Sequence, residues 1–245
     1  MMSILEEILQ KKASGKKQLA VLIDPDKYTD EVAERFASSV AQAKPDYIFV
    51  GGSLTASSTD DAIRHIKEKT DTKVVLFPGN STQLTDKADA ILMLSLISGR
   101  NADFLIGQHV VAAPFIRKSG IETISTGYML IESGTTTSVE YISNTRPIPR
   151  EKNDIAVATA IAGELLGNKA IYLEGGSGAK NPVPAQMIKA VSKNITLPVI
   201  VGGGLRSEDD IKTALEAGAD IVVIGTTLES DPEKMIKFAE IVRNF

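Results

Sequence analysis

Short apolar runs rich in β-forming residues recur along the whole chain, and most are continuously apolar rather than alternating. Parallel strands that are covered on both faces have this pattern, because neither face meets water. The runs predict eight strands, at 19–25, 46–53, 73–79, 90–96, 122–131, 170–176, 198–204 and 221–227.

Most stretches between these runs carry helical patterns with recognisable ends. After the seventh run, Ser207 and Asp210 are spaced as a capping box, and Gly218 stands where a C-terminal glycine is expected. Strands and helices that alternate eight times in 245 residues favour an α/β fold, a (β/α)8 TIM barrel forming one domain over 1–245. An open, doubly wound sheet is the main alternative.

Two segments depart from this alternation. Residues 77–90 allow only a stunted helix after the third strand, and 132–154 is long and irregular. Long loops of a barrel are often functional, so both segments are candidates for a role at the site.

Composition narrows the class of protein. The net charge of −4 is mild and argues against a nucleic-acid groove. The absence of cysteine excludes disulfides, thiolate nucleophiles and cysteine-bound metals, and fits a cytoplasmic location. The N-terminal segment, with Ile4, Leu5, Ile8 and Leu9 at helical spacing around two acids, is typical of an amphipathic helix rather than a signal peptide. No stretch is apolar for long enough to predict a membrane span.

Four of the eight predicted strands end in glycine pairs or runs. They are Gly51-Gly52, Gly175-Gly176 with Gly178, Gly202-Gly203-Gly204, and Gly225 followed by Thr226. Glycine lets backbone N–H groups approach an anion closely, and the loops after strands seven and eight are the usual phosphate site of such barrels. Tight turns would explain any single run, but three in succession on the last three strands favour a phosphorylated ligand.

Acidic residues stand at two strand ends. The first strand ends in Asp24-Pro25-Asp26-Lys27, whose acids and lysine could hold Mg²⁺ and a polyphosphate or simply form a turn. Ser53 could add a hydroxyl ligand. Glu174 ends the sixth strand beside the glycines, where a general base acting on a substrate hydroxyl explains an acid better than structure does. Tyr172, two residues earlier, faces the same side.

The chain has two histidines, and neither has metal-ligand spacing, which argues against a zinc site. We interpret His65 as a solvated surface residue and His109 as packed on its helix.

The motifs LIDPDK, FVGGS, FPGN, YLEGGSGA, VGGGLRS and IVVIGT, in this order at strand ends, resemble the geranylgeranylglyceryl phosphate synthase (PcrB-like) family over nearly the full chain. The length and the eight-strand layout are similar to its longer, archaeal-type group. The resemblance implies an Mg²⁺-dependent prenyltransferase that joins a polyprenyl diphosphate to the 3-hydroxyl of sn-glycerol 1-phosphate, in ether phospholipid biosynthesis.

The resemblance also implies residue roles. Asp24 and Ser53 would hold Mg²⁺, and Glu174, with Tyr172, would act on the attacking hydroxyl. The glycerol phosphate would be bound by Tyr172, Leu173, Glu174, Gly175, Gly176, Ser177, Gly178, Gly203, Gly204, Gly225 and Thr226. The prenyl diphosphate groove is expected at Lys27, Phe77, Asn80 and Tyr128.

The reaction needs an apolar trough that keeps water from the allylic cation. Candidates for its lining are Phe77, Tyr128, Met129 and Ile131, for which burial in the core is the alternative. A homo-oligomer, a dimer or a hexamer, and peripheral membrane contact are further expectations. Two rival functions remain: a phosphosugar isomerase-type barrel, and a noncatalytic barrel that binds a phosphorylated ligand.

Overall fold

The computed structural model describes residues 2–28 and 30–245, and its eight parallel strands close into a barrel. Each strand pairs with the next, and β8 pairs with β1. The strands are β1 (Gln18–Ile23), β2 (Tyr47–Val50), β3 (Lys73–Leu76), β4 (Ala90–Leu96), β5 (Glu122–Leu130), β6 (Ala170–Glu174), β7 (Val199–Gly202) and β8 (Ile221–Ile224). The predicted TIM barrel is confirmed.

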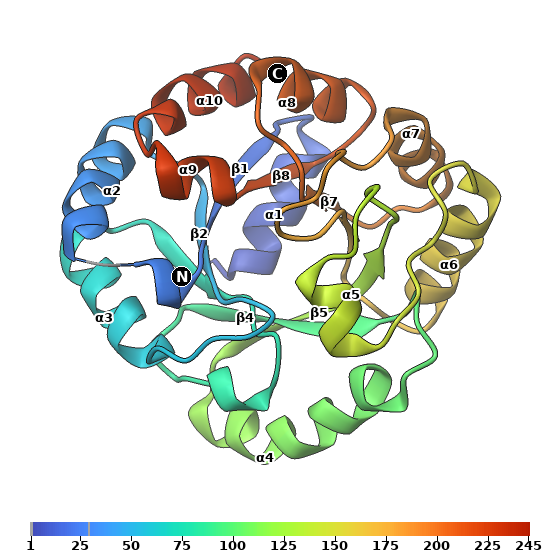
Figure 1. Cartoon of the computed structure of the whole chain (residues 1–245), viewed down its shortest axis with the longest axis horizontal. Helices are drawn as coiled ribbons and strands as arrows, with labels where there is room; N and C mark the ends of the chain where they lie inside the picture. The colour runs from blue at the N-terminus through green and yellow to red at the C-terminus, as the bar shows by residue number, and fades with distance from the viewer. Residues whose placement is uncertain (1, 29) are drawn as a thin grey trace.

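Helices form a ring around this barrel (Figure 1). The α-helices are α1 (Ile4–Ala13), α2 (Asp30–Ala43), α3 (Thr59–Lys69), α4 (Gln108–Ser119), α5 (Ser138–Ser143), α6 (Asn153–Leu165), α7 (Ala185–Asn194), α8 (Glu208–Glu216), α9 (Thr226–Ser230) and α10 (Lys234–Arg243). Shorter turns are η1 (Pro25–Lys27), η2 (Ser81–Gln83) and the π-helical η3 (Asp103–Gly107). None of the helices in the described ranges has the length and apolarity needed to cross a membrane.

All eight predicted strands exist, but most end earlier than the apolar runs suggest. The glycines that follow them lie in loops, and the last run is shortened most clearly, because Thr226 and Thr227 begin α9 instead of extending β8. The predicted capping box is confirmed at the start of α8, and Gly218 follows that helix with a φ of 112°.

The barrel interior is filled mainly by large side chains and is closed at one end by α1. Ile4 and Ile8 of α1 pack against interior residues such as Tyr47 and Phe49. The Glu122 carboxylate accepts the backbone N–H groups of Ile4 and Leu5 at 2.8 Å. Because Glu122 begins β5, α1 covers the N-terminal end of the barrel and leaves the C-terminal end open.

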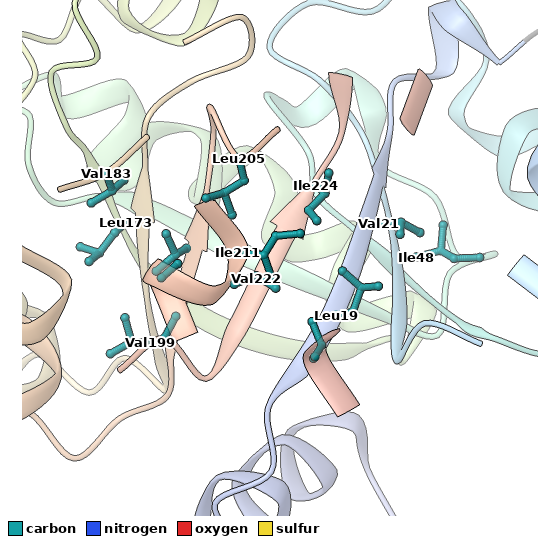
Figure 2. Packing of buried hydrophobic residues seen from close by; sticks show 14 of the residues in the cluster. Leu19, Val21, Ile48, Leu173, Val183, Val199, Leu205, Ile211, Val222 and Ile224 are labelled. Carbon is teal, nitrogen blue, oxygen red and sulfur yellow. The ribbon is translucent and has the colours of Figure 1, made fainter. Parts of the chain in front are cut away.

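A second apolar layer lies between the barrel and the helices (Figure 2). Along β8, Ile221 and Val223 belong to the interior, whereas Val222 and Ile224 belong to this outer layer. This alternation follows from the two-residue period of a strand.

The two irregular segments lie beside the open end. After β3 the chain forms only the three-residue η2, which confirms the stunted helix expected there. After β5, the segment that leads to α6 carries α5 and an isolated bridge between Ile131 and Ile148. No full helix therefore covers β3 between α3 and α4.

Candidate active site

A wide, partly polar cavity lies at the C-terminal ends of the strands. It brings together most of the residues predicted from sequence, with others from the loops. Its lining includes Asp24, Lys27, Ser53, Phe77, Tyr128, Tyr172, Glu174, Gly176, Ser177, Gly178, Gly203, Gly204, Arg206, Gly225, Thr226 and Glu229.

Two predicted substrate residues do not line this cavity. Leu173 is fully buried in the outer apolar layer, because it alternates with Tyr172 and Glu174 along β6 and so points away from the interior. The N–H of Gly175 donates to Gly202 O at 2.9 Å and continues the β6–β7 pairing. Neither residue lines the cavity, and their role in binding glycerol phosphate stays a prediction.

Glu174 is a buried carboxyl group at the floor of the cavity. Burial raises its pKa from 4.5 to about 6. The N–H of Gly176, which donates to Glu174 Oε1 at 2.6 Å, and the nearby hydroxyls of Tyr128 and Tyr172 oppose that rise. The group is therefore ionised near neutral pH, yet it is basic enough to take a proton.

Three aromatic rings gather beside Glu174. The ring centroids of Phe77 and Tyr172, and those of Tyr128 and Tyr172, are each 5.3 Å apart. Burial, with the charge of Glu174 as a smaller cause, raises the pKa of the Tyr172 phenol well above its ordinary value. Within the described chain the Tyr172 hydroxyl has no hydrogen-bond partner. Because this hydroxyl stays protonated and lies near the Glu174 carboxylate, it can turn to donate to a polar ligand beside Glu174.

The glycine loops have the backbone shape that the phosphate prediction needs. Gly203 and Gly204 have consecutive positive φ values, 79° and 77°, and Gly225 precedes the short helix α9. A Cβ on Gly203 would lie 2.5 Å from Glu174 Oε1, so only glycine fits there. Loops after the seventh and eighth strands that lead to a short extra helix are the common phosphate site of this fold.

Arg206 also lines the cavity and was not singled out as a site residue from the sequence. Its guanidinium donates to the backbone carbonyls of Ala179 and Lys180, so it ties the loop after β7 to the loop after β6. Its position directly after GGGL was the signal that could have identified it.

Asp24 and Ser53 lie on the opposite side of the same cavity. A Cβ added to Gly52, next to Ser53, would lie 3.5 Å from Asp24 Oδ1. Asp26 is different: it is exposed, and its carboxylate accepts the N–H groups of Ala56 and Ser57. Asp26 therefore holds the loop after β2 rather than facing the cavity. Among the described residues, no three His, Asp or Glu side chains form a metal cluster.

Lys27 reaches the cavity, and its ammonium pairs with Glu229 of α9 at 2.7 Å. Glu229 is a second lining residue that the sequence analysis did not identify. The pair joins the loop after β1 to the loop after β8.

An apolar groove adjoins the cavity where no full helix covers β3. The two share Gly52, Ser53, Phe77, Tyr128 and Val139. The groove continues between β4 and α4, past residues that include Leu84, Ile91, Met93, Phe104, Ala112 and Ile116. Its position supports the expectation that the stunted segment has a role at the site.

Of the residues expected in the groove, Phe77, Asn80 and Tyr128 line it, and Lys27 lies in the cavity. The Asn80 Oδ1 atom accepts the N–H of Thr82 at 2.8 Å, so this side chain also shapes η2. Met129 and Ile131 were wrong as lining candidates, because both alternate with inward-facing neighbours and are buried in the outer layer.

The histidines lie in different surroundings. His65 is half-buried, with its ring 5.7 Å from that of Tyr28, and is less solvated than expected. His109 lines the groove, and its Nε2 lies 3.1 Å from Ser95 Oγ.

Comparison with known proteins gives a consistent result. The model of the PcrB family matches residues 12–243. A geranylgeranylglyceryl phosphate synthase of Spirosoma linguale is 50% identical over 96% of this chain and 94% of its own length. The protein of the same name from Methanosphaera stadtmanae is 41% identical over 97% of each.

A solved structure shares the whole fold. The (S)-3-O-geranylgeranylglyceryl phosphate synthase of Thermoplasma acidophilum, crystallised in complex with its substrate sn-glycerol-1-phosphate, superposes with a TM-score of 0.93. It is 33% identical, and the match covers 100% of both chains.

Proposed function

Because this chain belongs to the PcrB family, we propose that it is a geranylgeranylglyceryl phosphate synthase. It joins a polyprenyl diphosphate to the 3-hydroxyl of sn-glycerol 1-phosphate. The observation that carries the proposal is the place of Glu174: a buried carboxyl group lies beside the glycine loops after β6 and β7, where a polar cavity meets an apolar groove.

The glycerol phosphate is assigned to the polar cavity. Its phosphate is held by the backbone of Gly203, Gly204, Gly225 and Thr226, which line one side. Its hydroxyls face Glu174 and the Tyr172 hydroxyl, which lacks a partner within the described chain. The related structure from Thermoplasma acidophilum binds sn-glycerol-1-phosphate, which supports this assignment.

The prenyl diphosphate is assigned to the groove and to the side of the cavity that carries Asp24 and Lys27. The apolar lining, including Phe77, Met93 and Ile116, suits an isoprenoid chain. Lys27 brings a positive charge to the diphosphate end of the substrate. There the diphosphate replaces the Glu229 carboxylate as the partner of the ammonium, or shares the ammonium with it.

Asp24 and Ser53 suit Mg²⁺. Both offer hard oxygen donors, and Mg²⁺ is commonly held by one or two protein groups with substrate phosphates and water completing its shell. A set of two protein ligands is therefore sufficient at this side of the cavity. When bound, Mg²⁺ would neutralise charge on the departing diphosphate.

The chemical step follows from this arrangement. The Glu174 carboxylate takes the proton of the 3-hydroxyl as the oxygen forms a bond to C1 of the prenyl chain. The bond from C1 to the diphosphate oxygen breaks, and the diphosphate leaves with the electron pair. The rings of Phe77, Tyr128 and Tyr172 border the place where the two compartments meet, so they exclude water and present π faces to the allylic cation.

Product formation from radiolabelled sn-glycerol 1-phosphate and geranylgeranyl diphosphate tests the proposal, with and without a chelator of Mg²⁺. We expect extractable label that requires Mg²⁺ and falls by about two orders of magnitude or more in Glu174→Gln. Glu68→Gln, a change at an exposed helix position, is the control. No label with either glycerol phosphate enantiomer and several prenyl lengths would overturn the transferase and favour a phosphosugar isomerase.

We also propose that the protein is a homo-oligomer. Leu165 and Leu166, which are 82% and 79% exposed at the end of α6, provide an apolar pair for a subunit contact. Light scattering should give a multiple of the 26.2 kDa chain mass, and a monomer at micromolar concentration would contradict the proposal.

A further inference from the structure

The helix that borders the prenyl groove has an apolar face turned to solvent. Ile106 of η3 and Val110, Val111 and Phe115 of α4 form this face, called the outer ridge below. Val110 and Val111 are each 66% exposed. Residues four apart lie on one side of a helix, so these side chains make a stripe rather than scattered points. In Figure 1, α4 lies at the rim of the molecule, with no element outside it.

The opposite side of the same helix lines the groove. Gln108, His109, Ala112 and Ile116 contribute to that lining. Ile142 of α5, which is also partly exposed, lines the groove from the other side. The outer ridge and the groove are thus two sides of one helix.

Two basic residues extend the outer ridge. Arg117 and Lys118 follow Val110 and Val111 by seven residues, which is about two helical turns, so they lie on the same side. Both are exposed, and neither forms an ion pair in the part of the chain that the structure describes. α4 contains no acidic residue, although the whole chain has a net charge of −4.

We infer that the outer ridge docks the protein on a lipid bilayer that carries anionic headgroups. Apolar side chains flanked by Arg and Lys are the pattern of helices that lie in a membrane interface, and each basic residue adds attraction to anionic lipid. A second copy of the same face would offer Arg117 and Lys118 no acidic partner from α4. Anionic headgroups offer that partner.

The inference rests on the proposed function in one respect, the lipid nature of the prenyl substrate. A polyprenyl chain dissolved in a bilayer would have to cross water to reach a groove far from the membrane, at a cost that rises with each methylene. Docking through the outer ridge places the bilayer against the helix that walls the groove. The substrate then moves from one apolar medium to another.

Co-sedimentation of the full chain with unilamellar vesicles tests the inference. We expect binding to phosphatidylcholine vesicles that contain phosphatidylglycerol, and weaker binding to phosphatidylcholine alone. The double variant Val110→Ser and Val111→Ser should lower the partition coefficient by about tenfold or more, whereas Val110→Leu and Val111→Leu should retain it. Arg117→Glu with Lys118→Glu should remove the preference for the anionic vesicles and its salt dependence.

Three results would overturn the inference: no vesicle binding by the unaltered chain, equal binding by the serine variant, or a changed native mass in that variant, which would make the outer ridge a subunit contact. Turnover of short, water-soluble geranyl diphosphate without vesicles tests the transferase reaction independently of membrane binding. The serine variant should match the unaltered chain in that assay. Vesicle binding by a chain that turns over no prenyl diphosphate would leave docking intact and contradict the transferase.

Discussion

At the scale of single residues, the proposed role of Glu174 as the base depends on its burial. Burial raises its pKa to about 6, and only the ionised form can accept the proton of the substrate hydroxyl. We therefore expect kcat/KM to be level above this pH and to fall about tenfold per pH unit below it. A steady-state pH profile from pH 4.5 to 8.5 measures this.

The second ionisation of glycerol phosphate also lies near pH 6, so the profile needs a control. If ionisation of Glu174 causes the fall in kcat/KM at low pH, the residual activity of Glu174→Gln should not show that fall. If ionisation of the substrate causes it, the variant should show the same fall. A midpoint near 4.5 in the unaltered enzyme would show that Glu174 is not the titrating base or that its site is more solvated than the structure indicates.

Gly203 has a left-handed backbone conformation and also lines the cavity. Its φ of 79° costs a non-glycine residue about 1–2 kcal/mol, and a new Cβ would lie 2.5 Å from Glu174 Oε1 and from Gly176 N. Gly203→Ala should raise the Kd for sn-glycerol 1-phosphate by about a hundredfold, beyond its effect on stability.

Gly120→Ala is the matched control. Gly120 has a φ of 70°, and a Cβ there would meet nothing within 4 Å. It should lower the melting temperature without changing the Kd measured by calorimetry. Equal losses of affinity in both variants would mean that backbone strain, and not the fit around the phosphate, causes the effect.

At the scale of elements, α1 closes the barrel end opposite the site. Ile8 is nearly fully buried in the barrel interior, while its neighbour Leu9 is 43% exposed. Ile8→Ala should lower the free energy of unfolding by about 2–5 kcal/mol, whereas Leu9→Ala should change it by about 0.5 kcal/mol or less. Urea unfolding measures both.

Because α1 lies at the far end of the barrel, affinity for sn-glycerol 1-phosphate should be unchanged in folded Ile8→Ala. A small stability loss in this variant would mean that α1 packs only loosely, and that the barrel strands themselves close this end.

Helices and strands were predictable from the sequence where the spacing of the apolar residues and the residues typical of caps and turns indicate the same element. The continuous apolar runs and the capping box at Ser207 both appear in the structure. The strand ends were extended too far, because Gly, Thr and Ser after an apolar run suit a strand end and a loop equally. Thr226 shows this, since it begins α9.

Site residues were predictable from sequence where the direction of the side chain was considered. The spacing of Tyr172 and Glu174 places both inside the barrel, as the structure has them. Leu173 was assigned as part of a contiguous motif, and Met129 and Ile131 as apolar candidates for the trough, without regard to direction; all three point outward. Val139 of the short helix α5 and Arg206 of the loop after β7 belong to the connections between strands, whose paths depend on tertiary contacts that no local pattern records.

At the scale of the whole molecule, the irregular segment after β3 and the groove are one feature. A helix packed on β3 and β4 would occupy the space beside Ile91 and Met93 that is now open. The fold thus gains an elongated apolar compartment without enlarging the barrel, whose interior is filled by side chains. Sequence predicted the irregularity, but the groove needed the placement of α4.

Because the polar cavity and the apolar groove are separate compartments, a substitution in the groove should change the kinetic constants for the prenyl substrate without changing those for glycerol phosphate. Met93 lies on the outward side of β4 and lines the groove but not the cavity that holds the glycine loops. Met93→Trp should fill part of the groove and lower kcat/KM for geranylgeranyl diphosphate by about tenfold or more relative to geranyl diphosphate, because the longer chain loses apolar contacts. The KM for sn-glycerol 1-phosphate should stay unchanged.

Met93→Leu conserves side-chain volume, so it should keep the ratio of the two prenyl substrates near that of the unaltered enzyme. If Met93→Trp lowered turnover of both prenyl substrates equally, the groove would not hold the distal chain. If the KM for glycerol phosphate rose with it, the cavity and the groove would be coupled through their shared wall at Phe77 and Tyr128 rather than independent.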